Sequence, residues 1–185
     1  MIKGKQLKEK IGTEIKQDIL ENLHRAVYLG IGSNLGNRKK NINNASYLLN
    51  KFLSINKLSN YYETNSWPNE NYPKYLNIVL KCKTNLNPLE LIKKLKNIEK
   101  KLGRKKNIKN YPRTCDIDII DYKGLKFKAK NLQLPHPHLS KRNFVLIPLF
   151  EIEKGWIYPE TNITIDKLIK NLDIKSLRSI KIFKK

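Results

Sequence analysis

The stretch that decides the fold is YPRTCDIDII, residues 111–120. Aspartate and isoleucine alternate in it with a period of two, which is typical of a β-strand. Side chains two residues apart share one face of a strand, so we expect Asp116 and Asp118 to point the same way. Ile117 and Ile119 then point into the core. Two carboxylates this close repel and raise each other's pKa, unless a cation lies between them.

The nature of that cation follows from the ligands on offer. Carboxylate oxygens, without histidine or thiolate on the same face, suit Mg²⁺ better than zinc. Two protein carboxylates also leave coordination positions free for water and substrate phosphates. The alternative is an exposed strand face whose aspartates pair with lysines. The DxD pattern alone leaves both interpretations open.

The arginines favour the first interpretation. Only six of the 38 basic residues are arginine, and an arginine fork can bind phosphate or carboxylate in a bidentate way that lysine cannot. Arg113 lies three residues before Asp116, Arg104 ends the preceding predicted helix, and Arg142 follows the LPHPH run. Carboxylates, magnesium and arginine together favour phosphoryl transfer. The sequence lacks a GxxxxGK[ST] loop, so a P-loop enzyme is excluded.

Working outward, the chain alternates strand and helix patterns before and after this stretch. The helix after Asn87 is the clearest, because Asn87 can cap it, Pro88 suits its first turn and Gly103 ends it. The order βαββαβ predicts an α+β fold with a mostly antiparallel sheet. Its expected strands span 26–32, 57–65, 75–84 and 114–122, and its expected helices span 41–55 and 88–102.

The C-terminal part is expected to add smaller elements to this core. The segment 123–134 is expected to form a hairpin with the 114–122 strand or with a neighbouring strand, and the proline-marked segment 134–152 is expected to lead to a short helix. The tail pattern predicts one more short helix at 166–171 and a last strand at 179–183.

The composition places few constraints on function. The chain has 185 residues, enough for one domain with a core, and a net charge of +22. That charge indicates either a polyanionic partner or a biased, lysine-rich composition, and the even spread of lysines favours the latter. An RNA-binding sheet would show exposed aromatic residues on its central strands, and none is evident, so we expect no nucleic-acid partner. No apolar run approaches the roughly 20 residues of a membrane span.

Residues 1–24 differ from the rest of the chain. Apolar residues recur there every four positions, with lysine and glutamate between them, which predicts an amphipathic helical extension. The expected domains are therefore this extension and a catalytic domain at 25–185. The extension is expected to pack on the domain or on a partner.

The two cysteines, Cys82 and Cys115, both lie in apolar, strand-like segments and form no CxxC pair. Buried, reduced thiols are typical of a cytoplasmic protein, which is the location we expect.

Several motifs together resemble those of the 6-hydroxymethyl-7,8-dihydropterin pyrophosphokinase family, over roughly residues 26–160. PRT-x-D-x-D-I followed by LPHP and a downstream R-x-F is the most specific combination. The matching segments are YLGIGSNLGNR at 28–38, YLN at 75–77, IEKKLGR at 98–104, PRTCDIDII at 112–120 and LPHPHLSKRNFVLIPLFEI at 134–152.

The resemblance implies a fold, a reaction and a pathway. The fold is a ferredoxin-like α/β/α sandwich. In the reaction, magnesium-bound ATP donates its β,γ-pyrophosphoryl unit to the hydroxymethyl group of the pterin, AMP leaves, and the product enters folate biosynthesis. The expected ligands are two Mg²⁺ ions, ATP as co-substrate and hydroxymethyldihydropterin. A folate-pathway partner bound through residues 1–24 is a further possibility.

The resemblance also implies roles at the phosphate end of the site. Asp116 and Asp118 match the ligands of the two magnesium ions, and Arg104 and Arg113 match the cations that clamp the triphosphate. Three further matches are nucleotide contacts, namely Glu99, His136 and Arg142.

At the pterin end, Tyr75 and Phe144 match the two rings that sandwich the flat pterin, and Asn77 matches the amide that reads its edge. Thr64 is retained from the family's run after the second strand, as a further substrate contact. Plain alternatives remain: Tyr75 as a strand-edge aromatic, Asn77 as the end of a hydrogen-bond row, and Phe144 as a core residue.

Overall fold

The structure, a computed structural model, describes residues 26–104 and 111–184. The helical extension expected at 1–24 lies outside the described residues, and so does most of the basic segment between Arg104 and Tyr111.

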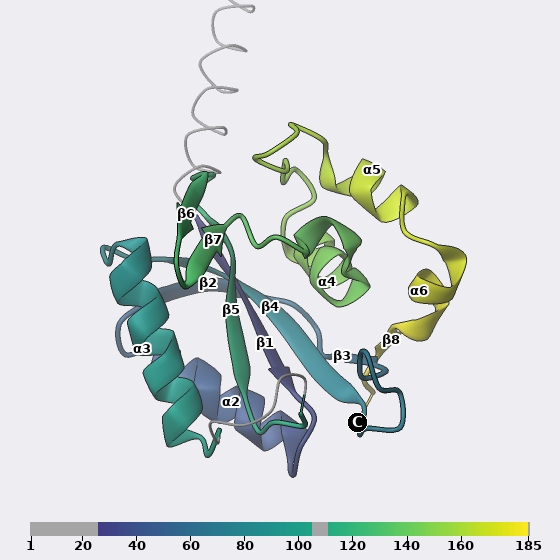
Figure 1. The fold of residues 1–185 in the computed structure, drawn as a ribbon, viewed down its shortest axis with the longest axis horizontal. Helices are drawn as coiled ribbons and strands as arrows, with labels where there is room; N and C mark the ends of the chain where they lie inside the picture. Colours follow the sequence, from purple (N-terminus) through teal and green to yellow (C-terminus); the bar gives the residue numbers. More distant parts are fainter. Residues whose placement is uncertain (1–25, 105–110, 185) are drawn as a thin grey trace, which may run out of the picture.

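An antiparallel sheet forms the centre of the molecule (Figure 1). The strand β1 (Val27–Ser33) lies between β5 (Asp116–Tyr122) and β4 (Tyr75–Lys83). The order β5-β1-β4-β3-β8 continues on the far side of β4, where β2 also pairs with β4. The remaining strands are β2 (Ser54–Leu58), β3 (Tyr62–Thr64) and β8 (Lys181–Ile182).

One face of the sheet carries the helices α2 (Arg38–Leu49) and α3 (Pro88–Lys101). Apolar side chains at alternate positions of β4 and β5 point to this face, as expected of strands with one firmly buried side. The helix α3 begins with a capping box, in which Asn87 and Glu90 satisfy each other's backbone N–H groups. The buried residues include Ile78, Leu80, Leu91, Leu95, Ile117 and Ile119.

The opposite face carries α4 (Asn143–Ile152) and α5 (Ile165–Lys170), preceded by the 3₁₀ turn η1 (Leu139–Lys141). Val79 and Ile120 point from the sheet into this second core. Figure 1 shows the two helix layers on either side of the sheet. The strand and helix order, with this pairing, confirms the predicted ferredoxin-like α/β/α sandwich.

The second expected strand, at 57–65, is divided in the structure. Leu58 faces Leu80 of β4, whereas Tyr62 faces Asn77, so three residues of one segment oppose two of the other. Ser59 fills the irregularity, because its hydroxyl accepts a hydrogen bond from the backbone N–H of Val79. The chain therefore forms the end of β2 and all of β3 where the sequence indicated one strand. The strand β2 begins at Ser54, inside the helix expected at 41–55, because α2 already ends at Leu49.

The C-terminal elements largely follow expectation. The segment 123–134 pairs with itself, as β6 (Phe127–Ala129) and β7 (Leu132–Leu134) of a separate two-stranded sheet, so the expected hairpin with the 114–122 strand or a neighbour is wrong. The elements α4, α5 and β8 match the other expected segments. The helix α6 (Ile174–Ser179) was not expected, because it buries no side chain and so leaves no apolar periodicity.

Both cysteines are buried and free, as predicted. Burial raises the pKa of the Cys82 thiol to about 12, and burial together with nearby carboxylates has the same effect on Cys115. Within the described ranges, every helix is too short or too polar to cross a bilayer.

Candidate active site

The C-terminal part of β1 and the N-terminal parts of β4 and β5 place three of the predicted site residues, Asn77, Asp116 and Asp118, in two cross-strand rows. In one row, Gly32 faces Asp116 on β5 and Asn77 on β4. In the next row, Gly30 faces Asp118 and Val79. Because glycine has no side chain, β1 forms a low floor between the acidic strand and the polar one. A Cβ atom at Gly32 would lie 2.9 Å from Asn77 Oδ1, so the close approach requires glycine there.

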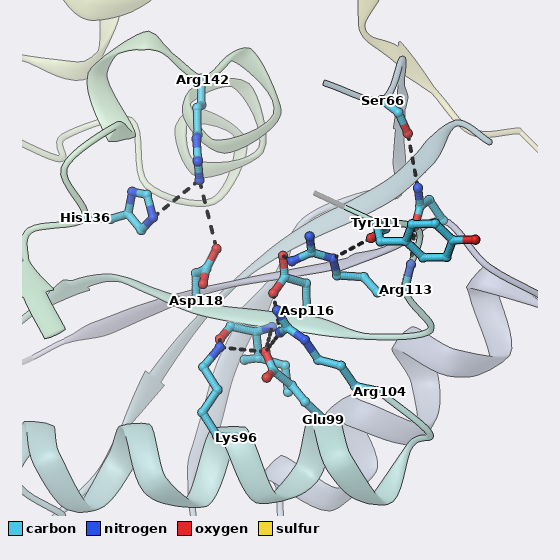
Figure 2. Close-up of polar contacts among 12 residues, drawn as sticks. Ser66, Lys96, Glu99, Arg104, Tyr111, Arg113, Asp116, Asp118, His136 and Arg142 are labelled. Carbon is cyan, nitrogen blue, oxygen red and sulfur yellow. Dashed lines mark hydrogen bonds and ion pairs between the residues drawn. The ribbon is translucent and has the colours of Figure 1, made fainter. Parts of the chain in front are cut away.

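Asp116 lies between two guanidinium groups, as Figure 2 shows. Its Oδ1 accepts from Arg104 Nη1 at 2.6 Å, and its Oδ2 accepts from Arg113 Nη1 at 3.0 Å. Burial pushes the pKa of Asp116 upward, but Arg113 and Arg104 outweigh it and the pKa lies below its ordinary value. Asp116 is therefore a fully ionised carboxylate already paired with cations.

Asp118 has the same orientation but a different environment. The nearest guanidinium atom, Arg142 Nη1, lies 4.0 Å from its Oδ2, and 38% of its side-chain surface stays exposed. Desolvation of the carboxylate, followed by repulsion from Asp116, raises the pKa of Asp118 to about 6. Negative charge on Asp118 is thus poorly compensated by the protein, and a cation bound there would lower the free energy of the ionised form.

Glu99 lies behind this pair and is 2% exposed. Its Oε1 accepts a 2.7 Å hydrogen bond from the backbone N–H of Ile117 and pairs with Lys96 at 2.8 Å and Arg104 at 2.6 Å. These contacts join α3 to β5 and hold Arg104 against Asp116 (Figure 2).

His136 and Arg142 lie together beside Asp118, with His136 Nε2 3.4 Å from Arg142 Nη1. His136 Nδ1 accepts from the backbone N–H of His138 at 3.2 Å, which leaves the ring proton on Nε2. Burial, then Arg142 and His138, lower the pKa of His136 to about 4, so the ring is neutral at pH 7. Two donors, Nε2–H and the guanidinium, therefore converge where an anionic oxygen could accept from both.

Three of the residues expected to bind the pterin lie on β3 and β4, on the side of the rows opposite Asp116 and Asp118. Asn77 is buried and donates from Nδ2 to Thr64 Oγ1 at 3.1 Å, which fixes the amide's orientation. Tyr75 lies on the same face of β4 and is half-buried. Its pKa is raised by burial, and the charges of Arg113 and Asp116 also act on it, so its ring adjoins the acidic end.

Phe144 approaches from α4 and not from the sheet. Its half-buried ring packs against the second core, and the Arg142 guanidinium carbon lies 5.5 Å from the ring centroid. Phe144 is thus linked to the acidic pair through Arg142. The partial burial keeps the core interpretation of this ring open.

Asn34 is a site residue that sequence reasoning missed. Its backbone N–H donates to Arg113 O at 3.1 Å, and its Oδ1 accepts from Arg113 N at 2.7 Å. Its Nδ2 donates to Ser66 Oγ and to Pro73 O, so one amide holds the Arg113 backbone and the segment before β4 together. The only sequence signal was a polar turn after a buried strand, which does not reveal that this side chain is 2% exposed.

The donor set fits magnesium held mainly by substrate. Within 26–104 and 111–184, the protein forms no cluster of three or more histidine, cysteine or acidic residues that could hold a metal ion alone. Asp116 and Asp118 offer only hard oxygen atoms on one partly exposed face, and the charge of Asp118 is compensated only in part, by Arg142 at 4.0 Å. An ion bound by two carboxylates would keep positions for water and phosphate oxygens.

Comparison with known proteins gives a single family. The family model described as 7,8-dihydro-6-hydroxymethylpterin-pyrophosphokinase (HPPK) matches residues 28–154. A 2-amino-4-hydroxy-6-hydroxymethyldihydropteridine pyrophosphokinase from Aquifex aeolicus is 49% identical over 72% of this chain and 83% of its own. The bifunctional protein FolKE of Lactococcus lactis is 38% identical over 81% of this chain.

Some relatives are much longer than this chain. It covers 43% of the Lactococcus FolKE and 22% of the folic acid synthesis protein FOL1 of Dictyostelium discoideum, which is 40% identical. Among solved structures, a Plasmodium falciparum HPPK-DHPS matches with a TM-score of 0.68 at 17% identity, over 85% of this chain and 46% of that one. At that identity, the structural match supports the fold alone.

Proposed function

This chain belongs to the 7,8-dihydro-6-hydroxymethylpterin-pyrophosphokinase family, and from that premise we propose which of its residues carry the reaction. The enzyme transfers pyrophosphate from ATP to 6-hydroxymethyl-7,8-dihydropterin in folate biosynthesis, giving the pterin diphosphate and AMP. The observation that carries the assignment is the pair of rows Asp116–Gly32–Asn77 and Asp118–Gly30–Val79. The rows support the proposal that a phosphate-binding end lies beside a pterin-binding end on one face of the sheet.

At the phosphate end, Asp116 and Asp118 are the proposed ligands of two Mg²⁺ ions carried by ATP. Bound magnesium would neutralise phosphate charge and polarise the phosphorus that is attacked. Arg104 and Arg113, which hold Asp116 at 2.6 and 3.0 Å, are the proposed cations for the same phosphates. Their charge would stabilise the pyrophosphoryl group during transfer, and the two side chains would need to move little.

His136 and Arg142 are the proposed contacts to the nucleotide. The neutral His136 ring presents Nε2–H beside the Arg142 guanidinium, 3.4 Å apart, and a phosphate oxygen would accept from both. Glu99 is the proposed positioning residue beside the nucleotide, because its Oε1 accepts from the Ile117 backbone N–H and pairs with Arg104. It positions Arg104 and the start of β5 beside the nucleotide.

At the pterin end, Tyr75 and Phe144 would hold the ring system by stacking, because flat aromatic surfaces gain from such contact. Asn77, oriented by Thr64, would read the mixed donor and acceptor edge of the pterin. The hydroxymethyl oxygen would then point toward Asp116 and Asp118. Catalysis consists mainly of holding this oxygen in line with the β-phosphorus.

A pair of variants tests the division between the two ends. Phe144→Ala should raise the KM for the pterin about tenfold, since an aromatic contact contributes ~1 kcal/mol beyond burial, and leave the KM for ATP unchanged. Arg142→Lys should raise the KM for ATP and leave that for the pterin unchanged, because lysine keeps the charge but loses the planar fork. Steady-state assays of AMP release measure both constants. Equal changes in the two KM values for either variant would contradict the assignment.

We also propose that residues 1–24 bind a folate-pathway partner. The support is their amphipathic pattern, together with relatives whose names describe fusions of pathway enzymes. Cross-linking of the purified chain to other folate enzymes, with and without substitution of Ile11 and Ile15 by lysine, tests this. Partner capture that survives both substitutions would exclude it.

We propose a cytoplasmic location, supported by two buried and free thiols in a chain without CxxC pairs. Fractionation of cells with an antibody to the protein tests the location, and recovery from a secreted fraction would contradict it.

A further inference from the structure

The segment 171–184 lies beyond the family match, which ends at residue 154, yet it contacts both walls of the proposed pterin site. We propose that this segment, the C-terminal brace, sets the distance between those walls, and that Asn143 is the positioning residue through which it acts. The inference rests on the proposed pterin site.

The brace is held at its first point by a buried amide. Asn143, the first residue of α4, is 7% exposed and donates from Nδ2 to Ser176 O at 2.6 Å and to Ser179 Oγ at 3.1 Å. Ser179 Oγ in turn donates to Ser176 O at 2.8 Å. The amide of Asn143 thus fastens α6 to the start of α4, directly before Phe144.

At its second point the brace extends the sheet. The strand β8 pairs with β3, where Ile182 faces Tyr62 and Lys181 faces Glu63, and Phe183 N donates to Tyr61 O at 2.8 Å. The next residue of β3 is Thr64, which orients Asn77. Figure 1 shows the chain passing from α5 through α6, beside α4, to β8 at the edge of the sheet.

Burial alone cannot hold the brace in place. No side chain of 171–184 is buried, although Leu172 and Phe183 pack partly against the two cores. A hollow of about 220 Å³ is lined by Glu63, Thr64, Asn65 and Lys74 together with Arg178, Ser179 and Lys181 of the brace. The polar contact at Asn143 and the pairing at β8 therefore fix the position of the segment, since a buried amide left without acceptors is unfavourable.

The geometry predicts that loss of the brace raises the KM for the pterin and leaves the KM for ATP unchanged. Arg142 has anchors of its own, because its backbone N–H donates to Leu139 O and its guanidinium lies near His136 and Asp118. Phe144 lacks an equivalent polar anchor, as its side chain is apolar. Loss of the contact at Asn143 should therefore shift the Phe144 wall more than the nucleotide contacts.

The test uses three variants of the full chain. Asn143→Ala should raise the KM for the pterin about fivefold, with the KM for ATP and kcat within twofold of wild type. Phe183→Pro, which removes the N–H donated to Tyr61, should have the same effect from the opposite end. Lys175→Ala, an exposed side chain on α6, is the matched control and should change nothing.

The brace would be overturned if the pterin KM stayed at its wild-type value in both Asn143→Ala and Phe183→Pro. It would also be overturned if the KM for the pterin and the KM for ATP rose equally. Should Asn143→Ala fail to fold, Phe183→Pro decides alone. The variant Phe144→Ala separates the two proposals. If it leaves the pterin KM unchanged, the pterin assignment fails and the brace fails with it, whereas a rise in Phe144→Ala alone refutes only the brace.

Discussion

Two neighbouring rows of one sheet place chemically identical residues in opposite situations. Asp116 and Asp118 both face a β1 glycine, two residues apart on the same strand. Asp116 accepts from two guanidinium groups and has a lowered pKa, whereas Asp118 has one guanidinium at 4.0 Å and a pKa raised to about 6. The other ends of the rows differ too, since one reaches Asn77 and the other reaches Val79 of the core.

Two carboxylates on the same strand face are therefore not equivalent. Asp116 is the organised end, with its charge already balanced by protein. Asp118 is the incomplete end, because Arg142 at 4.0 Å compensates its charge only in part and a bound cation would supply the rest. An incomplete partner on a rigid strand is what a substrate-borne metal requires, because binding then supplies the missing charge.

The largest expected effect is on catalysis at the incomplete end. Asp118→Asn should lower kcat/KM by about 10³-fold or more, since loss of a metal ligand removes several kcal/mol of transition-state stabilisation. AMP release from ATP and the pterin measures it, with circular dichroism as the control for folding. Activity near wild type would remove Asp118 from the metal site.

The next effect is on stability, and it should have opposite signs for the two aspartates in metal-free buffer at pH 8. Asp116→Asn should lower the free energy of unfolding by about 1–3 kcal/mol, because the amide keeps only one acceptor oxygen for Arg104 and Arg113 and loses the negative charge between them. Asp118→Asn should raise it by about 1 kcal/mol, after allowance for solvent screening of a side chain that is 38% exposed.

The pH dependence sharpens this stability contrast. The folded chain keeps a proton on Asp118 between about pH 4 and 6 that the unfolded chain has lost, so Asp118 lowers stability as pH rises through that window. Asp116 has a lowered pKa and stabilises at pH values above its ordinary pKa, an effect lost on acidification. Urea unfolding of both variants at pH 8 and pH 4 measures this. Shifts of the same sign at pH 8 would contradict the comparison.

A smaller effect separates the two floor glycines. Gly32→Ala places a Cβ 2.9 Å from Asn77 Oδ1 and should raise the pterin KM about tenfold, because overpacking costs ~1–3 kcal/mol. Gly30→Ala places its Cβ 3.4 Å from the flexible tip of Ile120 and should change the pterin KM less than twofold. Equal KM values in the two variants would show that the close approach at Gly32 has no role in substrate binding.

The smallest effect concerns His136. Its imidazole should titrate with a midpoint near pH 4, because burial and Arg142 disfavour the protonated ring. In the free enzyme this group contributes stability that is complete above about pH 6.5 and is lost as pH falls toward 4. The C2 proton shift in NMR measures the midpoint, with His136→Asn to assign the signal. A midpoint near 6.5 would remove the argument for a neutral donor at this position.

Local patterns in the sequence predicted much of this arrangement. The alternation at 116–119 indicated the shared face, and the cap at Asn87 with the stop at Gly103 placed Arg104 at the end of α3. Such signals act over a few residues, so they survive in a single sequence. The α+β class with a mostly antiparallel sheet followed from the succession of these elements, whereas the ferredoxin-like sandwich was implied by the family resemblance.

What escaped prediction depends on contacts between distant segments. The register that sets Gly32 between Asp116 and Asn77 is a property of three strands, and no local signal encodes it. Asn34 joins segments some 80 and 40 residues away through hydrogen bonds, and α6 has no buried face to reveal it. The attachment of α6 depends on Asn143, about 30 residues earlier in the chain.

The most direct measurement counts the metal ions bound with nucleotide. Manganese can replace magnesium in a titration followed by electron paramagnetic resonance, with a non-hydrolysable ATP analogue present. Wild type should bind two Mn²⁺ ions per chain, and Asp118→Asn should bind at least one fewer at the same free concentration. Two ions bound by the variant with wild-type affinity would contradict the claim that Asp116 and Asp118 together hold the metal-bound nucleotide.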